Sequence, residues 1–310
     1  MALPLPLGYG AGMHGWLILD KPLGLSSSQT VGAVKRVLRQ GGYPKAKIGH
    51  GGTLDPLATG VLPIALGEAT KLTGRMLDAD KAYAFTIGFG IETDTLDAEG
   101  VEIARSDVRP TRAAVEAVLP SFRGPIDQTP PAYSALKVEG ERAYKRARAG
   151  ETVELASRRV TIHDLEIVGA GEAGERLEAV TLAARVSKGT YIRSLARDIA
   201  HALGARGHVT MLRRTKAGPF TLDQAISLDK LEELGQGRAL EQALLPLTAG
   251  LDDIPALSVT ADQARLLRQG QKLIGSAATD GLHLATEGPV PVALVEVSDR
   301  EVRVVRGFNL

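Results

Sequence analysis

The sequence contains no cysteine among its 310 residues, which excludes disulfide bonds and cysteine-ligated zinc and suits a reducing compartment. It also lacks an apolar run near the length of about 18 residues that a membrane-spanning helix needs. Residues 1–12 are apolar and rich in glycine and proline, but they lack the basic segment with which a signal peptide begins. We therefore expect a cytoplasmic protein with no membrane partner, which begins with a disordered tail over residues 1–13.

An excess of charge of one sign is missing as well, because the formal net charge is only +1. Basic residues nevertheless gather locally: residues 201–220 hold four basic and no acidic side chains, and residues 134–150 hold five basic and two acidic ones. Such clusters are typical of a stripe that follows phosphates. A solvated face with unrelated charges would give the same counts.

The order of apolar patterns predicts short strands and helices that alternate irregularly. Strands are expected at residues 16–19, 62–66, 83–89, 160–168 and 177–186, and helices at residues 29–40, 111–119 and 190–203. Because no βαβ unit repeats, the fold class is α+β with a mixed, mostly antiparallel sheet flanked by helices. The acidic segment 92–97 lacks the spacing and the closing glutamate of a calcium loop, so we interpret it as a solvated loop and expect no metal.

A domain boundary is predicted near residues 250–255. Beyond it, one short helix (residues 260–267) and two short strands (residues 290–297 and 301–305) predict a compact β-rich unit. The expected division is therefore a tail over residues 1–13, a large domain over residues 14–252 and a small domain over residues 253–310.

Residues 50–60 (HGGTLDPLATG) place a single carboxylate, Asp55, among small and turn-forming residues. Pro56 biases Asp55 to an extended backbone, and the flanking glycines allow close approach of a ligand or another strand. This arrangement suits a nucleophilic carboxylate at the floor of a cleft. The alternative is an ordinary helix start, with Asp55 as the N-cap and Pro56 at the first helical position.

The segment resembles the signature of the TruB family of tRNA pseudouridine synthases, and five further segments occur in the order of that family. They are residues 16–27 (WLILDKPLGLSS), 67–71 (GEATK), 81–83 (KAY), 128–137 (QTPPAYSALK, continuing to Arg148) and 187–195 (SKGTYIRSL). The resemblance implies the pseudouridine synthase fold with a C-terminal PUA-like RNA-binding domain. Its first block begins just after Met13, which makes Met13 a second candidate for the start of the chain.

The resemblance implies roles for four residues. Asp55 is the expected nucleophile, Tyr83 stacks on the target base, Tyr191 is a second active-site tyrosine and a possible proton acceptor, and Arg193 pairs with the catalytic carboxylate. Taken singly, Tyr83 and Tyr191 would be interpreted as packing, and Arg193 as a surface ion pair. The sequence leaves open whether Asp55 attacks C6 of the uracil or C1′ of the ribose, and which group removes the C5 proton.

The expected substrate is the T-loop of tRNA, at tRNA position 55, and no cofactor or obligate protein partner is implied. The residues predicted to contact RNA or to position charge are His50, Lys21, Lys71, Arg142, Arg213 and Arg214. Two other functions stay open. One is a noncatalytic tRNA-binding or tRNA-folding protein. The other is a glycosidase or base-exchange enzyme, which usually needs a second carboxylate.

Overall fold

The computed structural model describes residues 12–134, 136–138, 140–153, 155–172 and 174–310. The predicted tail falls mainly on residues 1–11, which lie outside this range. For Met13 the prediction is wrong, because its side chain is buried against the apolar residues of one core cluster. No helix of the described residues is long and apolar enough to cross a membrane.

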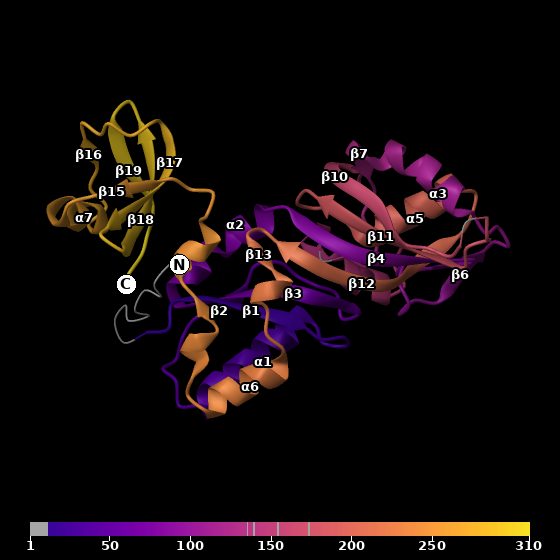
Figure 1. Ribbon diagram of the computed structural model, residues 1–310, viewed down its shortest axis with the longest axis horizontal. Helices are drawn as coiled ribbons and strands as arrows, with labels where there is room; N and C mark the ends of the chain where they lie inside the picture. The colour runs from indigo at the N-terminus through magenta and orange to yellow at the C-terminus, as the bar shows by residue number, and fades with distance from the viewer. Residues whose placement is uncertain (1–11, 135, 139, 154, 173) are drawn as a thin grey trace.

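A ten-stranded sheet forms the body of the molecule (Figure 1), with the order β14-β1-β3-β12-β4-β11-β10-β7, while β2 pairs with β3 and β13 with β12. Every pairing in this sheet is antiparallel except that of β3 with β12, so the predicted sheet type is confirmed. The strands are β1 (Gly15–Lys21), β2 (Ile48–His50), β3 (Ala58–Leu66), β4 (Lys81–Phe89), β7 (Gly124–Gln128), β10 (Arg158–Gly169), β11 (Ala179–Val186), β12 (Gly207–Ala217), β13 (Phe220–Thr221) and β14 (Leu244–Leu245).

Helices cover the sheet at two places (Figure 1). Near β1 and β3, α1 (Ser27–Gln40) packs with α6 (Leu228–Gln236), and the apolar stripe of α1 enters the core there. Its start is fixed by a capping box between Ser26 and Gln29. At the other end, α5 (Ile192–Ala202) buries Leu195 and Ile199 against β4, β10 and β11. The predicted helices 29–40 and 190–203 are thus present, with slightly different ends.

Shorter elements complete the body. These are α2 (Thr73–Asp78), α3 (Arg112–Val118), α4 (Ala143–Arg148), the hairpin of β5 (Ile91–Thr93) with β6 (Glu102–Arg105), the hairpin of β8 (Lys137–Val138) with β9 (Glu141–Arg142), and 3-10 turns at Gly67–Leu72, Leu119–Phe122, Leu222–Gln224, Leu240–Gln242 and Leu247–Gly250. Both hairpins lie beside the site described below, because residues of each contribute to its walls.

The C-terminal part is the β-rich unit that the sequence predicts. Its five-stranded sheet, β15-β17-β18-β19-β16, carries α7 and its own apolar core. This unit packs on the body, since Phe308 shares an apolar cluster with Trp16 of β1. The elements are β15 (Ala256–Ser258), α7 (Ala261–Arg268), β16 (Leu273–Ile274), β17 (Gly281–Glu287), β18 (Val290–Ser298) and β19 (Glu301–Gly307).

Candidate active site

The parallel pairing of β3 with β12 brings the segment before β3 to the middle of the sheet. Gly60 pairs with Arg214 in this register. Its φ is +101°, and a Cβ at this position would lie 2.1 Å from the backbone oxygen of Arg214. Only glycine tolerates both the dihedral angle and the close approach. Gly60 therefore serves the fit between the two strands.

Asp55 lies in a turn and not at a helix start, so the helix-cap alternative is wrong. The amide of Ala58 donates to the carbonyl of Asp55 at 3.0 Å. Pro56 is the second residue of this turn, a position at which β-turns favour proline. The preceding residue is fixed from α1, because Ser27 Oγ accepts from the Leu54 amide at 2.8 Å and donates to its carbonyl at 3.1 Å. The Asp55 side chain is 41% exposed and faces an open cleft on a rigid turn.

Arg193, near the start of α5, is the partner of Asp55. Its Nη2 lies 3.0 Å from Asp55 Oδ2, and its guanidinium also donates to the carbonyls of Thr95 at 2.8 Å and Tyr133 at 2.9 Å. Because the residue is only 5% exposed, the interpretation as a surface ion pair is wrong. The planar fork of arginine joins three separate segments at one point.

Asp97 is a residue of this site that sequence reasoning missed. Its carboxylate lies 3.5 Å from Arg193 Nη1 and is nearly buried. The prediction of a solvated acidic loop is therefore wrong for this residue, and also for Glu92, which is buried and 2.6 Å from His201 Nε2. No spacing in the sequence signals either contact, because both partners lie about a hundred residues further along the chain.

The two predicted tyrosines line the same cavity. The side-chain amide of Gln128 fixes the Tyr191 backbone, accepting from its amide at 2.7 Å and donating to its carbonyl at 3.1 Å. The Arg158 guanidinium lies 4.8 Å from the centre of the Tyr191 ring, a cation–π distance. Tyr83 lies on β4, where its backbone pairs with Arg214 of β12 on one side and with Ala184 of β11 on the other. The structure thus brings both rings to one place.

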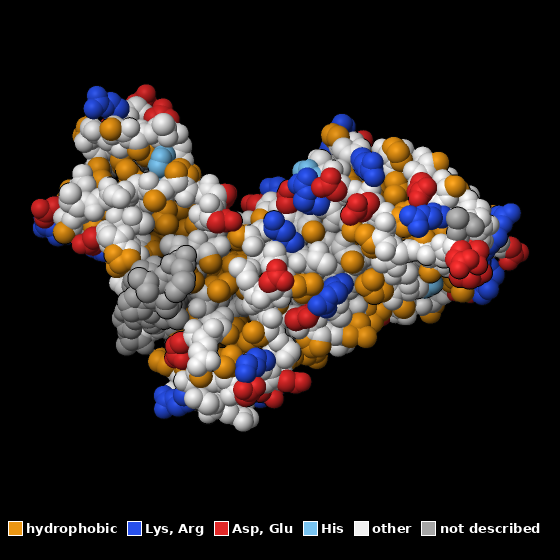
Figure 2. Space-filling view, viewed as in Figure 1, with side chains coloured by type: hydrophobic (Ala, Val, Ile, Leu, Met, Phe, Trp, Pro, Cys, Tyr) orange, Lys and Arg blue, Asp and Glu red, His pale blue; other side chains and the backbone are white. Residues whose placement is uncertain are grey.

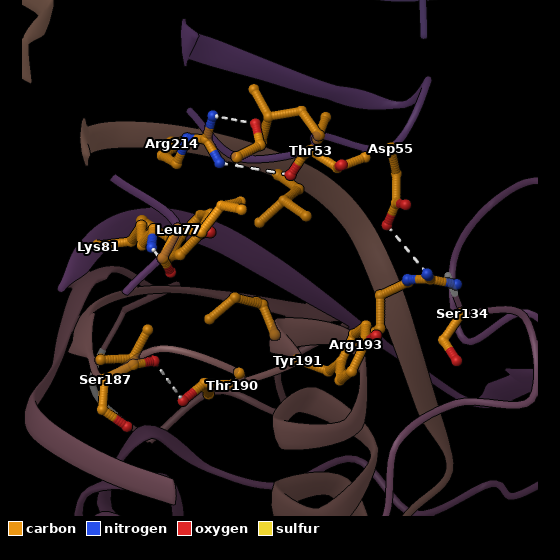
Figure 3. Close-up of a pocket in the computed structure, with 18 of the residues that line it drawn as sticks. Thr53, Asp55, Leu77, Lys81, Ser134, Ser187, Thr190, Tyr191, Arg193 and Arg214 are labelled. Carbon is orange, nitrogen blue, oxygen red and sulfur yellow. Dashed lines mark hydrogen bonds and ion pairs between the residues drawn. The ribbon is translucent and has the colours of Figure 1, made fainter. Parts of the chain in front are cut away.

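Two hollows adjoin at Asp55. The inner one has a volume of about 310 Å³, with both tyrosines and the apolar side chains of Leu77, Val186 and Leu212 in its wall. Figure 3 shows Leu77 and Tyr191 on this wall. The outer one, of about 880 Å³, is an open cleft bordered by His50, Arg142, Tyr144 and Arg148. Asp55 and Arg193 line both. A flat ring fits the inner cavity, and the outer cleft suits a longer polar chain.

The two predicted lysines both bind groups of the protein itself. Lys21 is fully buried, and its ammonium donates to the carbonyls of Pro22, Leu25 and Pro56. Burial lowers its pKa to about 8, with Asp55 acting in the opposite direction. Lys71 pairs with Glu68 at 2.6 Å and donates to the Gly307 carbonyl of the C-terminal unit at 2.9 Å. Of the two expected roles, the structure therefore favours positioning of the protein's own groups.

The predicted arginines differ in placement. Arg214 is 1% exposed and donates to the carbonyls of Val61 and Gly52 at 2.7 and 3.0 Å, so a phosphate contact at its guanidinium does not agree with its burial. Arg213 binds the Asp20 carboxylate with two hydrogen bonds of 2.7 and 3.0 Å. The predicted basic stripe thus consists partly of internal contacts, and in Figure 2 acidic and basic side chains alternate over the visible face.

His50 and Arg142 border the outer cleft, as an RNA-contact role requires. Burial, followed by the neighbouring Arg214 guanidinium, lowers the pKa of His50 below its usual value, which favours the neutral imidazole. Arg142 is exposed. Among the described residues, no three acidic or histidine side chains lie together as a metal site would need.

Known proteins are similar to this chain in sequence and in fold. Residues 35–192 match the model of the N-terminal domain of the TruB family of pseudouridylate synthases, and residues 193–252 match the C-terminal domain of tRNA pseudouridylate synthase B. The proteins named tRNA pseudouridine synthase B of Novosphingobium aromaticivorans and Zymomonas mobilis are 67% and 62% identical to this chain. The matches cover 96% of the chain and 98% and 96% of those proteins.

A solved structure of an H/ACA RNP bound to a substrate RNA containing 2′-deoxyuridine has a chain of the same fold. Its TM-score is 0.70 with 23% identity, over 95% of this chain and 85% of that one. The family matches and this shared fold place the chain among the pseudouridine synthases. The family matches go further: the chain belongs to the TruB family of pseudouridylate synthases.

Proposed function

We propose that this enzyme converts uridine to pseudouridine in the T-loop of tRNA, at tRNA position 55, with Asp55 as the nucleophile and without a cofactor. The observation that carries the proposal is the ion pair of Asp55 with the buried Arg193 at the mouth of a cavity that is large enough to admit a base. The similarity to proteins named tRNA pseudouridine synthase B supports tRNA as the substrate.

The reaction is an isomerisation. The bond between N1 of uracil and C1′ of ribose breaks, a bond between C5 and C1′ forms, N1 gains a proton and C5 loses one. Nothing is oxidised and no atom is lost overall, so the balance requires no redox group and no second substrate. A carboxylate that adds to C1′ or to C6 splits the exchange into two steps and is released in the second.

Each neighbour of Asp55 supports that chemistry. The Arg193 guanidinium provides a buried counter-charge 3.0 Å from the Asp55 carboxylate and fixes its position in the cleft. A base that leaves its stack needs an aromatic surface, which Tyr83 offers on β4, and the Tyr191 hydroxyl is our candidate for the acceptor of the C5 proton. The apolar wall of the inner cavity holds the detached ring close to C1′ while the bond changes.

The outer cleft is the proposed place for the RNA strand. Bases of a hairpin loop are already partly unstacked, which makes their displacement into a cleft less costly. His50 and Arg142 border this path. We assign residues 14–252 to the catalytic domain and residues 253–310 to a PUA-like RNA-binding domain of a cytoplasmic, monomeric enzyme.

The test is incubation of the purified protein with an unmodified tRNA transcript in the presence of EDTA, followed by mapping of pseudouridine by carbodiimide primer extension. We expect one stop, in the T-loop. Tight tRNA binding without any modification would replace the proposal by an RNA-folding role, and release of free uracil would replace it by a glycosidase. Modification at another position would retain the reaction and contradict the proposed substrate.

A further inference from the structure

Ser134 carries a buried hydroxyl group without a partner. The residue is 3% exposed, and its Oγ has no hydrogen-bond partner among the residues that the structure describes. Its backbone, in contrast, is well held, because its amide donates to the Ala132 carbonyl and its carbonyl accepts from the Tyr144 amide, each at 3.0 Å. Buried hydroxyls are normally paired, so this one is a candidate for a contact that forms only with a ligand.

The position of Ser134 indicates where that ligand lies. Ser134 lines the inner cavity and the outer cleft together with Asp55 and Arg193, so these residues form the neck between the two hollows. Arg193 Nη2 donates to the carbonyl of Tyr133, the residue before Ser134. In Figure 3 the Ser134 side chain lies next to the Arg193 guanidinium, with Asp55 on the other side of it.

The residues of the neck indicate which part of a bound nucleotide would lie next to Ser134. This step rests on the proposed function. If the uracil occupies the inner cavity and the strand occupies the outer cleft, the ribose lies in the neck, where Asp55 can reach the glycosidic carbon. A phosphate group is disfavoured there by the Asp55 carboxylate. In this arrangement the ribose group nearest to the glycosidic carbon is the 2′-hydroxyl, which is attached to the carbon next to C1′ and can pair with a serine hydroxyl.

We propose that the Ser134 hydroxyl binds the 2′-hydroxyl of the target nucleotide, and that Ser134 is thereby a specificity-determining residue for RNA over DNA. Two hydroxyl groups satisfy each other, because each both donates and accepts. The 2′-hydroxyl is the group by which a protein distinguishes RNA from DNA at one nucleotide. Because the Ser134 hydroxyl of the free enzyme has no hydrogen-bond partner among the described residues, we expect its loss to affect the complex and not the fold.

The experiment is a double-mutant cycle on binding, in the Asp55→Asn background so that no turnover intervenes. Two T-stem-loop RNAs that differ only in uridine or 2′-deoxyuridine at the target position are titrated against protein with Ser134 and with Ser134→Ala. For protein with Ser134, we expect the 2′-deoxy substitution to raise Kd about fivefold, the value of one neutral hydrogen bond. For Ser134→Ala protein, we expect less than a twofold difference between the RNAs.

Two controls complete the experiment. Ser134→Ala is expected to leave Tm of the free protein unchanged, because the Ser134 hydroxyl makes no hydrogen bond within the part of the chain that the structure describes. Ser187→Ala provides the matched serine: it lines the same cavity, but its Oγ already accepts from the Thr161 amide at 2.8 Å, so the fivefold discrimination should persist in that variant.

An equal effect of the 2′-deoxy substitution in Ser134 and Ser134→Ala proteins would overturn the inference, as would a fall of several degrees in Tm for Ser134→Ala. These outcomes leave the proposed function intact if protein with Asp55 still modifies the uridine RNA. Failure of both RNAs to bind, together with absence of pseudouridine, would instead refute the proposed function.

Discussion

Replacement of Arg193 by methionine should affect stability and activity together, because one guanidinium serves several groups. The variant leaves the nearly buried Asp97 carboxylate without its cation and two carbonyls, those of Thr95 and Tyr133, without a donor. Removal of one partner of a buried ion pair costs about 3–5 kcal/mol. Asp55 is 41% exposed, and solvent therefore reduces the contribution of the Asp55–Arg193 ion pair to this loss of stability. We expect a loss at the lower end of the range, about 3 kcal/mol.

For a domain of this size, 1 kcal/mol shifts Tm by about 2–4 °C, so calorimetry of Arg193→Met should show a fall of about 6–12 °C. The single-turnover rate should fall about 100-fold or more, because a misplaced nucleophile loses its alignment. The matched control is Arg197→Met, one turn further along α5, where the side chain is 20% exposed and pairs with Asp198; its Tm should change by less than about 4 °C. A Tm of Arg193→Met equal to that of the wild type would refute the reasoning.

Three further predictions concern the scaffold and the RNA. Gly60→Ala should destabilise the protein by more than about 3 kcal/mol in urea denaturation, because its Cβ would overlap the Arg214 carbonyl. The control Gly32→Ala, exposed in α1 with open space around it, should stabilise the protein by about 0.5–1 kcal/mol. Equal effects of the two substitutions would contradict the close approach of β3 and β12. The pKa of Lys21 is lowered from 10.5 to about 8 in the folded protein, so between these pH values the unfolded chain binds more protons than the folded one. The stability of the wild type relative to Lys21→Met should therefore rise as pH increases from 8 to 10.5. A fall of this stability difference with pH would show that burial does not penalise the ammonium. Arg148→Gln, in the outer cleft, should lower the salt slope of tRNA binding by about 0.7–0.9 if it contacts one phosphate, and an unchanged slope would place the RNA elsewhere.

Local patterns were sufficient to predict the main elements of the fold. The helices α1 and α5 and the strand β4 lie in the structure where their apolar patterns predict them, because each pattern depends only on the burial of one face of one element. The contact between β3 and β12 could not be predicted in this way. Gly60 signals a close approach, but the strand that approaches it lies about 150 residues later, and no local pattern names that strand.

The site was predictable as a set of residues but not as a network. The motif around Asp55 and the later Arg193 could be connected through the family resemblance, and the structure brings their side chains to 3.0 Å. Asp97 was interpreted as solvated because charge in a polar segment usually is. Arg214 was interpreted as part of a basic stripe because residues 201–220 hold four basic and no acidic side chains. Both are buried by contacts between distant segments.

The most direct test of the central claim is the single-turnover rate of pseudouridine formation by wild-type protein and by Asp55→Asn on the same unmodified tRNA, with tRNA Kd measured for both. Mass spectrometry of the variant should first exclude deamidation of the asparagine back to aspartate. We predict no pseudouridine above background from Asp55→Asn and a Kd within about threefold of the wild type, because the uncharged amide keeps the shape of the site but is not a nucleophile. Formation of pseudouridine by pure Asp55→Asn protein at the wild-type rate would contradict the account.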